Sequence, residues 1–297
     1  MTVVELDRPP SLPALYGRAA ARFLSGRRRI RDQVPDTELV LRGVRADPAR
    51  LAGYARVCGF RLTAAMPATF PHVLAFPLAL RLMTAPDFPF PAAGVVHLAN
   101  RIEQHRPLPV AEPLDLAVRA ESLRGHPRGR QVDLVATASV AGQPVWRDVS
   151  TYLYRTGSSG ARSDRGESPV TRQPTAIWQV PAGIGRAYAA VSGDRNPIHV
   201  STLAARGFGF KRRIAHGMWT KARCLAQLAG RLPDAFTVEV SFESPLLLPA
   251  TVAFTTTRVE QARRFWVQGL HNSRPHLSGE VRWPAAGGAG GEPQRSR

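Results

Sequence analysis

The chain has 297 residues, of which 44% are hydrophobic, so it can bury a substantial core and is not a disordered protein. It contains two cysteines, Cys58 and Cys224, which excludes a disulfide framework and a cysteine-based zinc module. The 40 Lys and Arg residues exceed the 22 Asp and Glu residues, and the net charge of +18 favours anionic partners without specifying one.

The beginning of the chain carries no recognisable targeting signal. Residues 1–10 mix charges and prolines and lack the apolar stretch of a signal peptide. The longest apolar run, at 73–80, has eight residues, whereas a membrane-spanning helix needs about 20. We therefore expect a soluble, cytoplasmic protein with no membrane partner.

The first half of the chain reads as one helix followed by strands. Residues 72–83 are apolar on nearly every side, which predicts a fully buried helix with Pro77 in its first turn. Four strand-like runs follow, at 94–101, 114–123, 131–140 and 145–155. The segment 157–173 is rich in Gly, Ser and Arg without apolar periodicity, so we interpret it as a linker.

The second half, at 174–283, repeats this order of elements. A turn is predicted at 187–191 and a helix at 216–230, with Gly230 as its C-terminal cap. Four further strand-like runs lie at 236–242, 251–259, 265–271 and 277–283. Residues 284–297 read as a disordered tail. A long helix followed by an antiparallel sheet, found twice, predicts an α+β fold.

A short internal repeat relates the two halves. Residues 54–60 (YARVCGF) align without gaps on 188–194 (YAAVSGD), and a histidine that opens the long helix follows in each half, His72 and His216. The second half has about ten additional residues between the repeat and its histidine. We interpret the chain as a duplicated unit of which one copy carries an additional loop.

The additional loop contains a carboxylate and an imidazole at short spacing. Within 192–199 (SGDRNPIH), Pro197 prevents a continuous helix, so a turn can bring Asp194 and His199 together. A carboxylate and an imidazole that share a water molecule form a plausible general acid–base pair. In the structural alternative, Asp194 and Asn196 only form the turn and His199 is a buried core histidine.

Two further features precede and open the second long helix. Gly217, at the helix N-terminus, exposes a backbone N–H that can stabilise an oxyanion, although close packing of the helix explains a glycine equally well. His216 is expected to structure this turn. The basic residues Lys211, Arg212 and Arg213 can contact phosphates or an acidic carrier protein, or form a solvated loop; Lys221 and Arg223 are weaker candidates. No spacing typical of a metal site is present.

These residues together resemble a known family. The run 188–199, followed by Gly207, Phe208 and 214–218, is similar to the signature of the MaoC-like (R)-specific enoyl-CoA hydratases and 3-hydroxyacyl-thioester dehydratases. The segments 70–77 and 100–104 resemble the N-terminal repeat of double-hotdog members. One departure is Ser201, where many members carry an acidic residue.

The resemblance implies a double hotdog, in which a long helix is wrapped by a curved antiparallel sheet twice. It places the catalytic pair at Asp194 and His199 and the oxyanion amide at Gly217. Residues 1–156 would form a non-catalytic repeat that binds the acyl chain, because Phe60 takes the position of Asp194 there. Residues 174–283 would form the catalytic repeat.

The implied reaction is the reversible syn hydration of trans-2-enoyl thioesters to (R)-3-hydroxyacyl thioesters, a hydro-lyase reaction of fatty acid metabolism. The substrate is an acyl-CoA or an acyl-carrier-protein thioester, with no metal and no cofactor. Chain length, carrier and physiological direction stay open, as does the choice between a monomeric pseudo-dimer and a homodimer. The alternatives are a non-catalytic acyl-thioester- or lipid-binding module, or a supporting subunit. Nucleic-acid binding rests on net charge alone, and we expect none.

Overall fold

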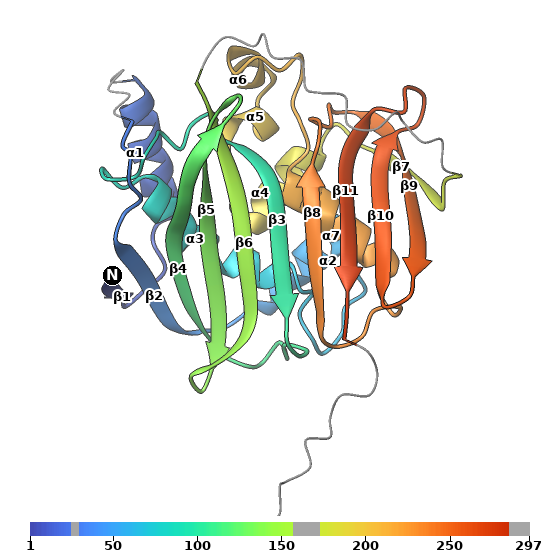
Figure 1. Ribbon diagram of the computed structural model, residues 1–297, viewed down its shortest axis with the longest axis horizontal. Coiled ribbons are helices and arrows are strands. Elements are labelled where there is room, and N and C mark those ends of the chain that lie inside the picture. The colour runs from blue at the N-terminus through green and yellow to red at the C-terminus, as the bar shows by residue number, and fades with distance from the viewer. Residues whose placement is uncertain (25–29, 157–172, 285–297) are drawn as a thin grey trace, which may run out of the picture.

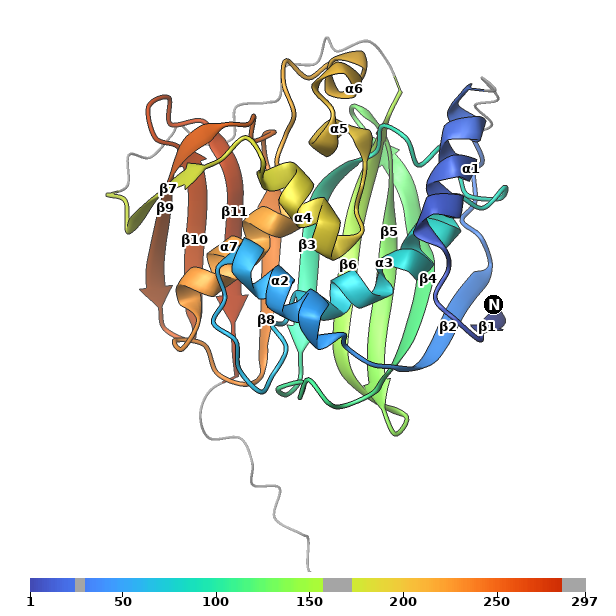
Figure 2. The same cartoon turned by 180° about the vertical axis from the view of Figure 1, so that it is seen from behind.

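The computed structural model describes residues 1–24, 30–156 and 173–284. All eleven strands in this part of the chain belong to one sheet, with the order β1-β2-β4-β5-β6-β3-β8-β11-β10-β9-β7. β1 pairs with β2 in parallel, and all other neighbouring strands are antiparallel. The long helices lie along one face of the curved sheet, as the two opposite views show (Figures 1 and 2).

The N-terminal half contains the predicted long helix and four strands after it. In chain order its elements are β1 (Thr2–Leu6), α1 (Leu12–Leu24), β2 (Thr37–Val44), α2 (Pro48–Cys58), α3 (Phe70–Met83), β3 (Val96–Gln104), β4 (Leu114–His126), β5 (Gly129–Val140) and β6 (Gln143–Arg155). Eleven of the fourteen residues of α3 are buried, as predicted. The predicted place of Pro77 is wrong: Pro71 occupies the first turn and Pro77 lies inside the helix.

The C-terminal half has the same order around its own long helix. Its elements are β7 (Ala176–Val180), α4 (Ile184–Ser192), α5 (Pro197–Val200), α6 (Thr202–Gly207), α7 (Gly217–Leu228), β8 (Phe236–Phe242), β9 (Ala250–Val259), β10 (Ala262–Gly269) and β11 (Pro275–Arg282). The C-terminal cap of α7 is Ala229 rather than the predicted Gly230. The additional loop of the second half forms α5 and α6.

The seven-residue repeat marks the ends of two equivalent helices, α2 and α4, where the sequence predicts only a turn. α2 ends at Gly59 and α4 at Gly193, with φ angles of +81° and +83° that glycine adopts without strain. The rings of Tyr54 and Tyr188 lie between these helices, with centroids 6.0 Å apart. The two halves therefore place corresponding residues about a common interface.

Strands β3 and β8 join the two halves into one sheet. They pair from Ala99 opposite Ser241 to Gln104 opposite Phe236. Along β8 the side chains of Phe236, Val238 and Val240 are buried beneath the sheet, and a single hydrophobic core extends through both halves. The chain thus has the predicted α+β double-hotdog architecture, with α3 and α7 as the two central helices.

The described residues include only part of the segments predicted to bound the two repeats. Residues 1–156 carry β1 to β6 and residues 174–283 carry β7 to β11. The predicted linker at 157–173 lies outside the described residues except for Gln173, and the predicted tail at 284–297 lies outside them except for Pro284. None of the helices in the described ranges is long and apolar enough to span a membrane.

Candidate active site

A cavity of about 1200 Å³ lies between the two halves. The C-terminal half contributes the segment around α5 and the N-terminus of α7, and the N-terminal half contributes α1, α3, β3 and β6. The three residues predicted to act in catalysis, Asp194, His199 and Gly217, all line it. The structure thus brings them to one cavity, while their catalytic roles stay predictions.

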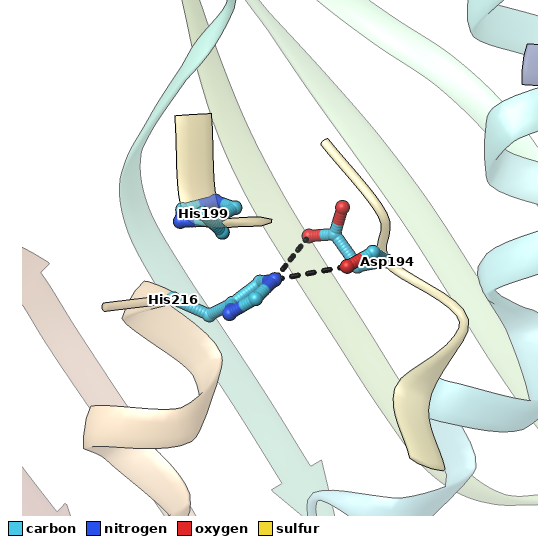
Figure 3. A group of neighbouring side chains, drawn as sticks. All are labelled: Asp194, His199 and His216. Carbon is cyan, nitrogen blue, oxygen red and sulfur yellow. Dashed lines mark hydrogen bonds and ion pairs between the residues drawn. The ribbon is translucent and has the colours of Figure 1, made fainter. Parts of the chain in front are cut away.

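Asp194 follows the left-handed Gly193 at the end of α4. Its backbone N–H donates to Ser192 Oγ at 3.1 Å, and its Oδ1 accepts the N–H of Asn196 at 3.1 Å. Asn196 then caps α5 through its side chain, and Pro197 takes the first helical position. The predicted turn is therefore present, and it uses one oxygen of Asp194 while Oδ2 lies on the side of His216 (Figure 3).

His199 lies on α5 and is 8% exposed. Its Nδ1 is 2.9 Å from the carbonyl oxygen of Ile214. Because a carbonyl oxygen can only accept, we assign the proton to Nδ1, which leaves Nε2 with its lone pair. A metal-free imidazole held in this tautomer can accept a proton at Nε2.

His216 connects the two other polar side chains. It is the N-cap of α7, and its ring stacks on that of His199 with centroids 3.7 Å apart. Its Nε2 lies 2.9 Å from the carbonyl oxygen of Asp194 and 3.8 Å from Oδ2 of the same residue (Figure 3). Nδ1 has no hydrogen-bond partner among the described residues. His216 therefore ties the N-terminus of α7 to the turn that carries Asp194, and it also supports the ring of His199.

Burial and mutual charge set the protonation of this group. Burial alone would raise the pKa of Asp194, but the imidazoles of His216 and His199 and the Asn196 N–H outweigh it and lower that pKa. Burial lowers the pKa of His199 below 6.5 although Asp194 opposes this, and burial together with His199 lowers the pKa of His216 to about 3. Near neutral pH the site holds an aspartate anion beside two neutral imidazoles.

Asp194, His199 and His216 each offer an atom that could bind a metal ion, and these atoms lie within 4.8 Å of one another. His216 uses Nε2 as a donor to the carbonyl of Asp194, so in this tautomer its lone pair is at Nδ1. The same three side chains also supply what an acid–base pair needs, a carboxylate beside an imidazole with a free lone pair.

Gly217 is the first residue of α7, and within the described chain its N–H donates no hydrogen bond. A Cβ at this position would lie 2.9–3.0 Å from three atoms of the Phe242 ring. Both functions considered for this glycine are therefore compatible with the structure. The absence of a side chain allows the close packing, and the unpaired amide at the positive end of the helix is available to an oxyanion.

The three basic residues predicted to contact the carrier of the substrate do not line the cavity. Lys211 and Arg212 are exposed and Arg213 is half-buried, and none of the three is part of the cavity lining, although the adjacent Phe210 and Ile214 are. The arginines that line the cavity among the described residues are Arg128, Arg155 and Arg195. The sequence does not indicate that these arginines meet at the cavity, because two of them, Arg128 and Arg155, lie in the N-terminal half of the chain.

Lys221 and Arg223 do not fit the phosphate-binding role considered for them. Lys221 is 0% exposed, and its Nζ donates to Asn100 Oδ1 and, at 3.2 Å each, to the carbonyl oxygens of Asn100 and Val238. The Arg223 guanidinium lies over the Trp178 ring, 5.5 Å from its centroid. On α7, Lys221 thus faces the sheet and Arg223 lies beside the end of α2, so neither side chain points into the cavity.

The N-terminal half lacks a copy of the Asp194–His199 pair, as the sequence predicts. Phe60 follows Gly59 at the position that corresponds to Asp194, and α3 begins without an intervening helical loop. His72, which corresponds to His216, instead bonds the buried carboxylate of Asp148 through Nδ1 at 3.0 Å. Asn100 also donates to Asp148 and accepts from Lys221, so this network links the two halves.

Comparisons with known proteins agree with this architecture. A model of the MaoC-like domain matches residues 162–273. The chain is 40% identical over 254 residues to 3-hydroxyacyl-thioester dehydratase X of Mycobacterium tuberculosis, which covers 84% of this chain and 91% of the relative. Over 74 residues it is 38% identical to the (R)-specific enoyl-CoA hydratase of Rhodospirillum rubrum, covering 24% of this chain and 51% of that enzyme.

A solved structure extends the likeness to three dimensions. The crystal structure of HtdX from Mycobacterium tuberculosis superposes with a TM-score of 0.75 and 38% identity, covering 82% of this chain and 99% of that one. Because a relative at this identity is matched over nearly its whole length, the likeness includes both halves and not the C-terminal half alone. The chain therefore belongs to the MaoC-like dehydratase family.

Proposed function

We propose that the chain is a hydro-lyase that interconverts trans-2-enoyl thioesters and (R)-3-hydroxyacyl thioesters. The observation that carries this proposal is the convergence of an aspartate anion, a neutral imidazole and an unpaired helix amide on one cavity. The named activities of the two relatives support the reaction class. The chemistry needs only the thioester and water, so we expect no cofactor and no metal.

In the hydration direction, a water molecule donates its two O–H groups to Asp194 Oδ2 and His199 Nε2, and its oxygen faces C3 of the substrate. The oxygen forms a bond to C3 while one O–H bond breaks and its proton passes to the pair. The pair then returns one proton to C2, so one water is added overall. Because both events occur on the side of the pair, the addition is syn.

Gly217 supplies the electrostatic part of the reaction. As the C3–O bond forms, electrons move from the double bond onto the thioester oxygen, which becomes enolate-like. The N–H of Gly217, at the positive end of α7, can donate to that oxygen. One such donor is worth about 3–4 kcal/mol of transition-state stabilisation.

The N-terminal half is proposed to hold the acyl chain. Its contribution to the cavity is mainly apolar and includes Val73, Phe76 and Leu80 of α3 and Ala19 and Ala20 of α1. The anionic carrier, coenzyme A or the acidic face of a carrier protein, would meet Lys211, Arg212 and Arg213 on the surface and Arg195 at the cavity wall. A cytoplasmic location and a monomeric or dimeric state stay predictions.

The test is the loss of ultraviolet absorbance of the conjugated thioester when the purified chain is mixed with crotonyl-CoA and, separately, with a longer trans-2-enoyl-CoA. Rapid loss that the Asp194→Asn variant abolishes is expected, and chiral analysis of the product should give the (R) alcohol. Binding of both thioesters without turnover would instead support a non-catalytic binding module. An (S) product would contradict the stereochemical part of the proposal.

A further inference from the structure

Helix α1 lies between β1 and β2 in the chain and packs against the central helix α3 of the N-terminal half. Leu15 of α1 is buried against Phe76 and Leu80 of α3. In the view from behind, α1 stands beside α3 at the edge of the N-terminal half (Figure 2). At its other end, Arg22 donates to the carbonyl oxygen of Ala85 at 2.7 Å. The helix is thus fixed on the fold at both ends.

Tyr16 of α1 reaches from this position to the turn that carries Asp194. Its hydroxyl donates to the carbonyl oxygen of Gly193 at 3.1 Å and accepts the N–H of Arg195 at 2.7 Å. The same oxygen is 3.5 Å from Asp194 Oδ1. The phenol therefore contacts the residue before Asp194, the residue after it and the carboxylate itself, although it lies 178 residues away in the sequence.

The geometry also fixes the orientation of the carboxylate. Oδ1 faces the Asn196 N–H and the Tyr16 hydroxyl, while Oδ2 lies on the side of His216. Burial, followed by the charge of Asp194, raises the pKa of Tyr16 above its ordinary value, so the phenol keeps its proton and stays a donor. The side chain of Leu12, one turn earlier on α1, occupies the space where a Cβ of Gly193 would be.

We propose that Tyr16 is a positioning residue of the active site, whose hydroxyl holds the turn 193–195 so that Asp194 presents Oδ2 to the water and His199. The inference rests on the proposed function, because it assigns Asp194 a task in turnover. It makes α1, an element of the N-terminal half, part of the site around Asp194. Tyr16 acts through Asp194 and is not itself expected to touch the reacting atoms.

The experiment compares Tyr16→Phe with the wild type in the enoyl-thioester assay. Phenylalanine keeps the ring that packs on α3 and removes only the hydroxyl. We expect kcat to fall about 10- to 100-fold, because a small misplacement of a catalytic group has an effect of this size. KM should stay the same, because the ring of Tyr16, which lines the cavity, is kept. The unfolding temperature should fall slightly, because the two hydrogen bonds of the hydroxyl are lost.

Tyr154→Phe is the matched control. Its ring stacks on Phe90, with centroids 5.2 Å apart, and it is not part of the cavity lining, so loss of this hydroxyl should leave kcat unchanged. Rates are measured well below the unfolding temperature of each variant, so that a loss of folded protein does not enter kcat.

Each result decides the inference. An unchanged kcat in Tyr16→Phe overturns it, and so does a higher KM with unchanged kcat, which would place Tyr16 in binding. A loss of kcat that Tyr154→Phe shares also overturns it. An inactive wild type would instead remove the proposed function on which the inference rests, and the two failures are therefore distinguishable.

Discussion

The imidazole rings of His199 and His216 lie face to face, with centroids 3.7 Å apart and planes inclined by 26°. Two imidazolium ions at this distance would repel each other strongly, and both rings are buried. The stack therefore favours neutral rings. The Nε2 of His216 is committed to the Asp194 carbonyl, which leaves His199 as the proposed base.

Asp194→Asn and His199→Gln should each lower kcat by about 100- to 10,000-fold, which is the range for loss of a general acid or base. Both substitutions preserve the approximate size of the side chain, so circular dichroism and the unfolding temperature should change little. His271→Gln, at an exposed histidine outside the cavity lining, is the control. Near-normal turnover in either of the first two variants would contradict their assignment as the acid–base pair.

The acid limb of kcat/KM should lie below pH 6.5. In the proposed mechanism turnover needs Asp194 ionised and His199 neutral, and the pKa of each is lowered from its ordinary value, 3.8 and 6.5 respectively. Lowering the pH therefore inactivates the enzyme only once His199 begins to take up a proton, below the ordinary histidine value. Initial rates across the acid range give this midpoint. A midpoint at or above 6.5 would mean that burial does not control the protonation of His199.

Gly217→Ala should reduce kcat, by up to about 100-fold, which approaches the loss of a whole oxyanion donor. The new Cβ would lie 2.9–3.0 Å from the Phe242 ring, so either the ring or the first turn of α7 must move. A smaller residue at 242 provides the internal control. In a Phe242→Leu background the same glycine substitution should cost much less, and an equal cost in both backgrounds would exclude the clash as the cause.

Lys221 should make stability depend on pH. Burial lowers its pKa from 10.5 to about 7, so above pH 7 the unfolded chain binds one proton that the folded chain does not. The free energy of unfolding should therefore rise between pH 7 and pH 9. The upper limit is set by Cys58 and Cys224, because burial raises the pKa of both thiols above the ordinary value of 9.0 and both oppose the trend at higher pH.

The two lysines of the chain allow a direct comparison. Lys221→Met should abolish this rise, and it should also destabilise the fold by about 1–3 kcal/mol because oxygen atoms of Asn100 and Val238 lose a buried donor. Lys211→Met, at an exposed lysine, should keep both the stability and its pH dependence. Denaturant unfolding at several pH values measures the difference, and a parallel response of the two variants would rule out Lys221 as the source.

Eight of the eleven described strands and both central helices could be predicted, because their apolar side chains alternate, recur at helical spacing or fill the whole segment. Strands β1, β2 and β7 were not predicted. Strand β8 has the predicted bounds, 236–242, since buried and exposed residues alternate along it. Strand β10 begins earlier than predicted, at Ala262, because Arg263 and Arg264 carry no hydrophobic signal although their backbone pairs. The ends of helix α2, Asp47-Pro48 and Gly59, carry capping signals from which a helix could have been predicted. Its small and charged residues favour a turn when hydrophobicity alone is considered.

The residues of the site also divide into those that could be predicted from the sequence and those that depend on the packed fold. Turn chemistry predicts that Asp194 and His199 meet, and the resemblance to the family places Gly217 beside them. The hydroxyl of Tyr16 and the guanidinium of Arg50, which donates to the carbonyls of Val191 and Ser192, come from the other half of the chain. The apolar spacing of Leu12, Leu15, Tyr16 and Ala19 could have predicted α1 as a helix. Its position against the catalytic turn depends on the packed fold.

The pairing of β3 with β8 has a consequence for how the protein behaves on dilution. A site assembled from two separate subunits is lost when the subunits dissociate, but here the covalent chain keeps both halves at a high effective concentration. Turnover per chain should therefore be independent of protein concentration. In a symmetric dimer every substitution is present in both copies. Here the two halves have separate sequences, so a substitution near Phe60 leaves the corresponding position, Asp194, unchanged.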